Sequence, residues 1–263
     1  MTSALKYTNK LAQRHVLVLG GTSGMGFCVA EAALEYGASV VVSGSSSDKL
    51  ERALSRLRHS YPSLSSKITG YTCDLSDLAT QEANLLALLQ AATVHAKLDH
   101  IAMTAGDALE IVPITNASAD YIQRAGTVRF IGAVMLAKLL PAFVVAGSES
   151  SLTLTGGVNT TKPAPGWSIM AGWGGALEGL MRGLAVDLKP LRVNLVSPGA
   201  VHTELFNSIP ADHLQSMLEA WREKTLTGSV AKPEDVAEAY VYTMKDHGVT
   251  GTIINTNGGC LLK

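Results

Sequence analysis

Short, almost wholly apolar runs alternate along the chain with longer segments in which apolar and charged residues are mixed. The first run, residues 16–19 (Val-Leu-Val-Leu), has no polar position, which is typical of a parallel strand buried on both faces. Further strands are expected at residues 37–42, 68–77, 98–106, 151–155, 191–199 and 251–255. Helices are expected at residues 27–36, 49–58, 78–92, 121–140, 167–188 and from 232 onward. This alternation predicts an α/β fold, a doubly wound parallel sheet flanked by helices, in a single domain over residues 1–263.

Two of these segments carry a more specific expectation. The apolar helix at 121–140 contains Arg129 and is expected to end at Pro141, because proline disfavours continuation of a helix. The polar, helical segment at 200–227 follows the sixth strand and would suit a mobile lid.

The turn after the first strand is rich in glycine. Residues 20–26 read Gly-Gly-Thr-Ser-Gly-Met-Gly and lead directly into a helix. Backbone N–H groups and the helix dipole make such a turn an anion site, and a Cβ would block the approach of a phosphate. Because a second strand follows at 37–42, the pattern predicts a Rossmann-type dinucleotide site.

The second strand ends in a run of serines, residues 43–47 (Ser-Gly-Ser-Ser-Ser), and no acidic residue stands before Asp48. NAD-binding enzymes usually place a carboxylate there for the ribose 2′-OH. Because this chain has no carboxylate at that position, a 2′-phosphate would not be repelled there, and the serine hydroxyls can donate hydrogen bonds to it. The run therefore favours NADP(H) over NAD(H), although no arginine supports the choice and a flexible serine turn is the alternative.

Composition narrows the function classes. The chain has 263 residues, 47% of them hydrophobic and 16% charged, with a net charge of −1, so neither nucleic acid nor an anionic membrane is an expected partner. No apolar run approaches the ~20 residues of a membrane span. The three cysteines show no metal or redox spacing, so we expect no metal site and a reducing compartment, the cytoplasm.

Several stretches, in order over nearly the whole chain, resemble the short-chain dehydrogenase/reductase family. They are residues 20–26, 73–75, 104–106, 192–203 and 250–259. The resemblance implies that Thr203 and the backbone of Val201 hold the nicotinamide amide and that Asp74 meets the adenine. It also implies a homo-oligomer, a dimer or tetramer. The expected cofactor contacts are Gly20, Thr22, Ser23, Gly24, Met25, Ser43, Ser45, Ser46, Asp74, Leu75, Thr104, Ala105, Gly106, Pro198, Gly199, Val201 and Thr203. An N-cap for the helix at 78–92 is a second interpretation of Asp74 or Asp77.

The catalytic half of that family pattern is missing. The register on the family's helix puts Met170 where the proton-donating Tyr belongs and Gly174 where the Lys belongs. The Ser position falls on 156 or 157, with Thr155 adjacent, and the Asn position falls on Arg129. The sequence therefore predicts an intact nucleotide site without the usual proton-handling groups.

This loss limits the chemistry. Reducing a ketone needs a positioned acid, whereas hydride addition to an iminium gives a neutral amine and needs none at that step. Arg129 would bring a fork of donors able to hold a carbonyl, an enolate or an anionic oxygen, and a salt bridge or surface position is the alternative. Trp167 and Met170, three apart, can form one wall for a flat hydrophobic, indole-type substrate; plain core packing is an equal interpretation of Trp167 and of Trp173.

A narrower resemblance fits these substitutions. Fungal short-chain dehydrogenase relatives from bicyclo[2.2.2]diazaoctane indole alkaloid pathways, of the malbrancheamide and paraherquamide type, also lack the tetrad. They carry an Arg at the position of Arg129 and a loop similar to residues 163–167 (Pro-Ala-Pro-Gly-Trp), with an Asp where this chain has Ala164. The resemblance implies NADPH-dependent reduction of a cyclic iminium or zwitterionic indole dipeptide, coupled to an intramolecular Diels–Alder closure. The alternatives are a redox-silent NADP(H)-binding protein and a carbonyl or imine reductase of other secondary metabolites.

Overall fold

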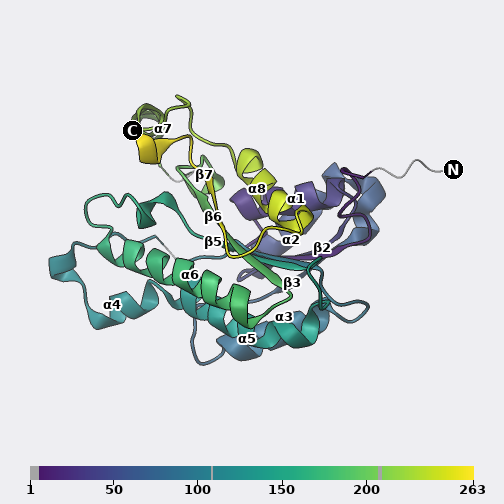
Figure 1. The fold of residues 1–263 in the computed structure, drawn as a ribbon. Coiled ribbons are helices and arrows are strands. Elements are labelled where there is room, and N and C mark those ends of the chain that lie inside the picture. Colours follow the sequence, from purple (N-terminus) through teal and green to yellow (C-terminus); the bar gives the residue numbers. More distant parts are fainter. Residues whose placement is uncertain (1–5, 108, 207–208) are drawn as a thin grey trace.

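The computed structural model describes residues 6–107, 109–206 and 209–263. Seven parallel strands form one sheet in the order β3-β2-β1-β4-β5-β6-β7. Figure 1 shows this sheet with helices packed around it. The bounds of the strands are β1 (His15–Leu19), β2 (Ser39–Gly44), β3 (Ile68–Thr72), β4 (His100–Met103), β5 (Ser151–Thr155), β6 (Arg192–Pro198) and β7 (Ile253–Thr256). The predicted doubly wound parallel sheet is confirmed.

Strand β1 shows why the sheet needs a layer of helices on each side. Val16 and Val18 point into one apolar core, and Leu17 and Leu19 point into the other. All four side chains are at most 2% exposed, because successive side chains of a strand alternate between the faces of the sheet. A strand with no polar position is therefore stable only between two helical layers.

The helices divide between these two faces (Figure 1). One layer holds α1 (Gly24–Glu35), α2 (Ser47–Ser60) and α8 (Pro233–Lys245), and α1 packs closely against α8. The other layer holds α3 (Gln81–Ala92), α5 (Gly132–Phe143) and α6 (Ser168–Asp187). Two further helices, α4 (Ala119–Arg124) and α7 (Ala211–Glu223), project from one side of the molecule in Figure 1.

The expectation of one continuous helix at 121–140 is wrong. The segment is divided into α4, a π-helical turn at Thr127–Ile131 and α5; we call the second piece the π-turn. The N–H groups of Phe130 and Ile131 both donate to the carbonyl of Gly126, at 3.1 and 3.0 Å. This shared acceptor widens the turn and re-aims the side chains that it carries, as is frequent at functional sites.

Pro141 does not end the helix, which was the second expectation for this segment. It lies inside the last turn of α5, and the helix continues to Phe143. Proline lacks an N–H and so costs α5 one backbone hydrogen bond, but the chain keeps its helical course to the following residues. The N–H of Val144 still donates to the carbonyl of Leu140 at 3.0 Å.

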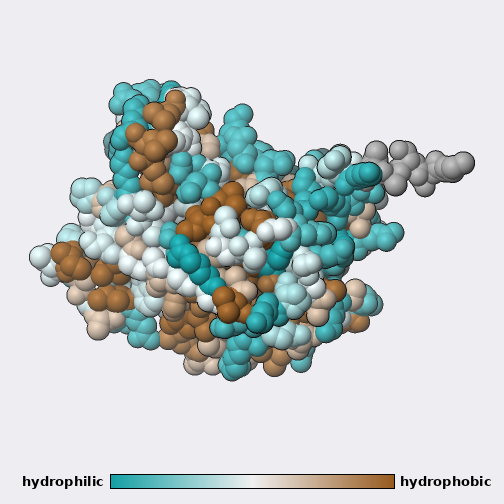
Figure 2. Space-filling view, viewed as in Figure 1, coloured by the Kyte–Doolittle hydropathy of each residue, from teal (hydrophilic) through white to brown (hydrophobic). Residues whose placement is uncertain are grey.

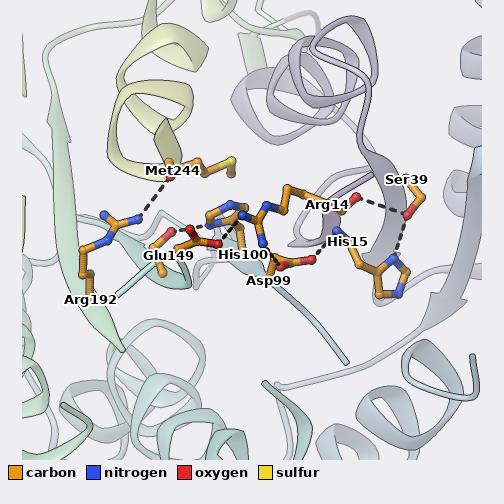
Figure 3. Close-up of polar contacts among 9 residues, drawn as sticks. Arg14, His15, Ser39, Asp99, His100, Glu149, Arg192 and Met244 are labelled. Carbon is orange, nitrogen blue, oxygen red and sulfur yellow. Dashed lines mark hydrogen bonds and ion pairs between the residues drawn. The ribbon is translucent and has the colours of Figure 1, made fainter. Parts of the chain in front are cut away.

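A polar network joins the amino ends of the central strands, at the opposite edge from the glycine turn (Figure 3). The Asp99 carboxylate accepts from Arg14 Nη1 at 2.9 Å and from the backbone N–H of His15 at 2.8 Å, and Arg14 also pairs with Glu149. The side chain of His100 is buried and its Nδ1 lies 2.9 Å from Ser151 Oγ. These contacts fasten β1, β4 and β5 to one another at their first residues.

Within the described ranges, the helices are all too short or too polar to span a lipid bilayer. The segment predicted as a lid contains α7, while residues 207 and 208 lie outside the described residues. The movement of this segment over the site stays a prediction.

Candidate functional site

A cleft of about 610 Å³ opens at the carboxyl ends of the strands. It lies where the strand order reverses, between β1 and β4, which is the usual ligand position in open α/β sheets. The expected cofactor residues that line it are Gly20, Thr22, Ser23, Gly24, Met25, Ser43, Ser45, Ser46, Asp74, Leu75, Thr104, Ala105, Gly106 and Thr203. Pro198, Gly199 and Val201 do not line it; they lie at and just after the end of β6, where Gly199 N donates to Thr256 O at 3.0 Å.

The glycine turn is packed too closely for side chains at two positions. A Cβ on Gly20, whose φ is +85°, would lie 2.5 Å from the backbone N of Ala105. A Cβ on Gly26 would lie 2.3 Å from the carbonyl oxygen of Gly20. Helix α1 therefore starts directly against β1 and the segment after β4, and its N-terminus faces the cleft.

An internal carboxylate occupies this helix N-terminus. The backbone N–H of Gly24 donates to Glu204 Oε2 at 2.8 Å, and Glu204 Oε1 lies 3.5 Å from Arg56. Burial raises the pKa of Glu204, but the hydrogen bonds from backbone N–H groups and the charge of Arg56 outweigh it and lower the pKa overall. The start of α1 thus donates a hydrogen bond to a carboxylate, and a pyrophosphate would use the same kind of N–H donor.

The end of β2 offers hydroxyls and one cation. Ser43 Oγ is buried without a hydrogen-bond partner among the described residues, and Ser45, Ser46 and Lys49 also line the cleft. Ser46 caps α2 by accepting from the N–H of Lys49 at 3.4 Å. Sequence analysis did not single out Lys49, although its place three residues after a capping serine put it in the first turn of the helix.

Asp74 lies exposed on the cleft beside β3. Its Oδ1 accepts from the N–H of Ser76 at 2.9 Å, which closes a tight turn, and the residue lines the cleft. The alternative of a helix N-cap is wrong for Asp74, because α3 begins at Gln81 with Thr80 as its N-cap. Asp77 makes the contacts of a cap for the turn that leads into α3, since its carboxylate accepts from the N–H of Ala79 at 3.0 Å and its carbonyl accepts from the N–H of Gln81 at 2.9 Å.

Arg129 reaches the cleft from the π-turn. Its guanidinium lies over Gly106, where a Cβ would come within 2.1 Å of Nη2. Its Nε is buried without a partner, and no ion pair joins the guanidinium to a carboxylate in the described part of the chain. Burial lowers the pKa of the Arg129 guanidinium, and the charge of the nearby Asp107 opposes this shift only in part. A guanidinium nevertheless stays protonated at neutral pH. The donors of Arg129 thus point at a space that a ligand can fill.

The other four expected catalytic residues do not line this cleft. Thr155 is 3% exposed, and its Oγ1 donates to Met103 O at 2.7 Å and pairs with Tyr240 Oη at 2.6 Å. Ala164 is exposed in the loop before α6, while Trp167 and Met170 are half-buried at the start of that helix. None of these four borders the cleft, so Arg129 alone of the five does.

Trp173 has a packing role. Its indole Nε1 donates to Ile122 O at 2.8 Å, and its ring lies 5.1 Å from that of Phe130. The ring also covers Gly126, where a Cβ would come within 2.4 Å. Of the two interpretations left open for Trp173, the structure supports packing against the π-turn.

The hydroxyls of two tyrosines near the site are already engaged. Tyr121 lines the cleft, but its Oη donates to Glu110 O at 2.7 Å. Tyr240 is fully buried on α8, and burial raises its pKa to about 12 even though the hydrogen bond to Thr155 and the charge of Arg129 oppose the shift. Neither phenol is placed as a free acid facing the cleft.

Together, the parallel sheet, the glycine turn at its first strand and the cleft at the point of strand reversal define a dinucleotide-binding α/β protein. The family model described as "SDR-like rossmann domain" matches residues 7–263, and the chain belongs to the short-chain dehydrogenase/reductase family. Membership of this family makes the cleft a nicotinamide dinucleotide site. The predicted family and fold class are therefore confirmed.

Known proteins are similar to this chain in sequence and structure over nearly its full length. The short-chain dehydrogenase/reductase malC of Malbranchea aurantiaca is 46% identical over 254 residues, which cover 96% of each chain. A solved structure of the MalC reductase/Diels-Alderase from Malbranchea aurantiaca has a TM-score of 0.93 and 45% identity, covering 97% of this chain and 99% of that one. A small-chain dehydrogenase solved in complex with NADPH has a TM-score of 0.76 and 26% identity, covering 95% and 100%.

Proposed function

We propose that this chain is an NADP(H)-dependent reductase of a cyclic iminium or zwitterionic indole dipeptide, whose pocket also templates an intramolecular Diels–Alder closure in fungal indole alkaloid biosynthesis. The observation that carries the proposal is the Arg129 guanidinium, which lies at the cleft over Gly106 without an acceptor among the described residues. The 45% identity to a protein named as a reductase/Diels-Alderase supports the same activity.

The nearby hydroxyl groups are engaged in other hydrogen bonds, and this favours a C=N substrate over a ketone. When bound, a reduced nicotinamide supplies a hydride to an electron-poor carbon. A ketone so reduced needs a proton from a positioned acid, but the hydroxyls of Tyr121, Thr155 and Tyr240 are engaged elsewhere. An iminium gives a neutral amine and needs no acid at that step. Its reduction is therefore the chemistry that these residues permit.

The proposed role of Arg129 is to bind and orient the substrate. A guanidinium presents a planar fork of N–H donors, which suits a carbonyl, enolate or anionic oxygen on the dipeptide ring. Because it keeps its proton at neutral pH, it acts through charge and geometry and not as an acid. Holding the diene and alkene face to face in such a pocket can contribute ~7–11 kcal/mol to an intramolecular cycloaddition.

Apolar surface near the site suits a flat hydrophobic substrate. The segment before α4 and α4 itself expose Leu109, Ile111, Ile114 and Ile122, and α7 carries further apolar side chains on the same side of the molecule (Figure 2). Ile111 lies beside Gly166 of the loop that follows Ala164, since a Cβ on Gly166 would be 3.0 Å from Ile111 Cγ2. We propose this loop, with Trp167 and Met170, as the substrate side of the site.

For the cofactor we propose NADP(H) in preference to NAD(H). The Lys49 side chain supplies a positive charge at the end of β2, and Ser45 and Ser46 supply hydroxyls in the same part of the cleft. These groups would hold a 2′-phosphate, whereas a ribose 2′-OH is usually held by a carboxylate. The proposed compartment is the cytosol, supported by three cysteines that remain free thiols.

We further propose a homo-oligomer that assembles through α6. Gly172, Gly175, Gly179 and Gly183 recur along this helix, and a Cβ at each would meet nothing within 4 Å. Such a stripe lets a second helix approach closely, and Val186, 65% exposed, extends the same helix. Light scattering of the purified chain measures the assembly directly.

The experiment follows NADPH consumption and product formation with an indole-bearing cyclic iminium, a matched ketone and NADH as the alternative cofactor. We expect turnover of the iminium with NADPH, no turnover of the ketone, and a weaker rate with NADH. Arg129→Ala should abolish product formation and leave the NADPH dissociation constant nearly unchanged, and Arg52→Ala, exposed on α2, serves as the control.

Three other results would contradict parts of the proposed function. Unchanged turnover in Arg129→Ala would remove this residue from the mechanism. NADPH binding without turnover of any imine would identify a redox-silent NADP(H)-binding protein, and efficient reduction of the ketone would identify an ordinary carbonyl reductase.

A further inference from the structure

The π-turn that carries Arg129 begins with backbone N–H groups that have no helical acceptor of their own, as at any helix start. A side chain from another element satisfies two of them. Asp107 Oδ1 accepts from the N–H of Val128 at 2.7 Å, and Asp107 Oδ2 accepts from the N–H of Arg129 at 3.0 Å. Both oxygens of one carboxylate are therefore held by consecutive residues of the π-turn.

Asp107 holds the backbone of Arg129 and is also next in sequence to Gly106, over which the Arg129 guanidinium lies. Both Asp107 and Arg129 line the cleft. The short segment 106–107 after β4 thus contacts Arg129 at its backbone and at its guanidinium, which leaves the side chain little freedom in direction.

Other side chains fasten the first residue of the π-turn and the helix α4 before it, but not Arg129. Gln81 Nε2 donates to Thr127 O at 2.9 Å and to Leu75 O at 2.7 Å, and Trp173 donates to Ile122 O at 2.8 Å. Asp107 is the described side chain that hydrogen-bonds the backbone of Arg129 itself. Its loss would free the residue on which the proposed function depends.

We propose that Asp107 is the positioning residue for Arg129: its bidentate contact with the N–H groups of Val128 and Arg129 sets the guanidinium at the cleft. The inference rests on the proposed role of Arg129. The action is geometric, because both carboxylate oxygens accept from backbone N–H groups and the guanidinium donates no hydrogen bond to them. A misplacement of about 1 Å can cost ~10²-fold in rate, so the effect should be large.

The test compares Asp107→Ala and Asp107→Asn with Asp77→Asn. Asp77 makes a similar contact to a backbone N–H, at Ala79, but does not line the cleft. We expect kcat for the iminium to fall by ~10²-fold in Asp107→Ala, less in Asp107→Asn because its amide oxygen still accepts one N–H, and not at all in Asp77→Asn. The NADPH dissociation constant should stay unchanged in Asp77→Asn, and kcat of the Asp107 variants is measured at saturating NADPH, so that any change in cofactor affinity is kept apart from the loss of kcat.

A double-mutant cycle separates positioning from a general structural role. If Asp107 acts through Arg129, then Asp107→Asn causes little further loss of kcat in Arg129→Lys, a background that keeps the charge and some activity but lacks the planar fork of donors. Additive losses in the double variant, or full activity of Asp107→Ala, would overturn the proposal.

A readout that needs no turnover keeps this inference apart from the proposed function. Hydrogen exchange of a peptide covering residues 127–131 should quicken in Asp107→Ala and Asp107→Asn, and stay unchanged in Asp77→Asn. If the wild-type chain fails to reduce any iminium, the proposed function fails, and unchanged exchange in the Asp107 variants would separately refute the positioning contact.

Discussion

At the scale of single residues, charge decides what the cleft can hold. In one part of the cleft, the Arg129 guanidinium has no acceptor among the residues that the structure describes, and Lys49 brings a positive charge near the end of β2. Glu204 instead brings a negative charge to the N-terminus of α1 and accepts from the N–H of Gly24. A dinucleotide pyrophosphate would need that same N–H region, so its binding and the Glu204 contact compete.

Glu204→Gln should therefore bind NADPH more tightly. The substitution removes a charge that opposes the phosphates, and a charge at a helix terminus is worth ~0.3–1 kcal/mol, or roughly a two- to fivefold lower dissociation constant. The pKa of Glu204 is lowered from its usual value, so the carboxylate is charged at neutral pH and the effect should appear there. Fluorescence titration with NADPH measures it, with Glu219→Gln on α7 as the control; equal or weaker binding would contradict the competition.

At the scale of elements, the π-turn joins distant parts of the chain. It receives Asp107 from the end of β4, Gln81 from α3 and the ring of Trp173 from α6. These partners explain why a segment with a helical apolar pattern is not one continuous helix. Side-chain contacts from three elements stabilise a local geometry that the helical periodicity of the segment disfavours.

The substitution Gly126→Ala tests the packing of Trp173 against the π-turn. The φ of Gly126 is −122°, which any residue adopts, so Gly126→Ala introduces no backbone strain. The added Cβ would meet the Trp173 ring at 2.4 Å, and displacing a packed ring should lower the unfolding free energy by ~1–3 kcal/mol and reduce turnover. Chemical denaturation measures the change, and Gly248→Ala, in an exposed turn, is the control. A variant as stable as the wild type would show that the Trp173 contact is dispensable.

At the scale of the whole molecule, the two edges of the sheet have different tasks. The carboxyl edge is open and holds the cleft, whereas the amino edge is closed by the network of Arg14, Asp99 and Glu149 (Figure 3). His100 is buried beside this network, and burial with the charges of Arg192, Arg14 and His247 lowers its pKa from 6.5 to about 3. Side-chain contacts therefore hold the strands together at their amino ends, while the cleft at their carboxyl ends is open to a ligand.

This shift predicts how stability depends on pH. Between pH 6.5 and about 3 the unfolded chain binds a proton at His100 that the folded chain does not, so the unfolding free energy falls as the pH falls. From pH 7 to pH 5 the loss from this group should be about 2 kcal/mol. Denaturation at the two pH values should show a smaller difference in His100→Gln than in the wild type, while His59→Gln, exposed on α2, should match the wild type. An equal pH dependence in His100→Gln would contradict the assignment.

Local chemistry allowed much of the site to be predicted. The glycine turn, the serine run and Asp74 are each short stretches beside a strand end, and parallel strands bring their carboxyl ends to one edge of the sheet. Asp107 was missed because nothing in its neighbours marks it; its partners are 21 and 22 residues away. Thr155 was predicted as a catalytic residue because it stands next to the position of the family's Ser, whereas its hydroxyl is engaged with Met103 and Tyr240.

The sequence by itself determined the sheet, its two helical layers and the nucleotide turn, because each depends on patterns within a few residues of one another. The tertiary structure alone decided the break at the π-turn, the direction of Arg129 and the contact of Glu204 with α1. The physical reason is that these features are set by hydrogen bonds and packing between side chains and backbone groups from different elements. Periodicity along the chain carries no record of such pairings.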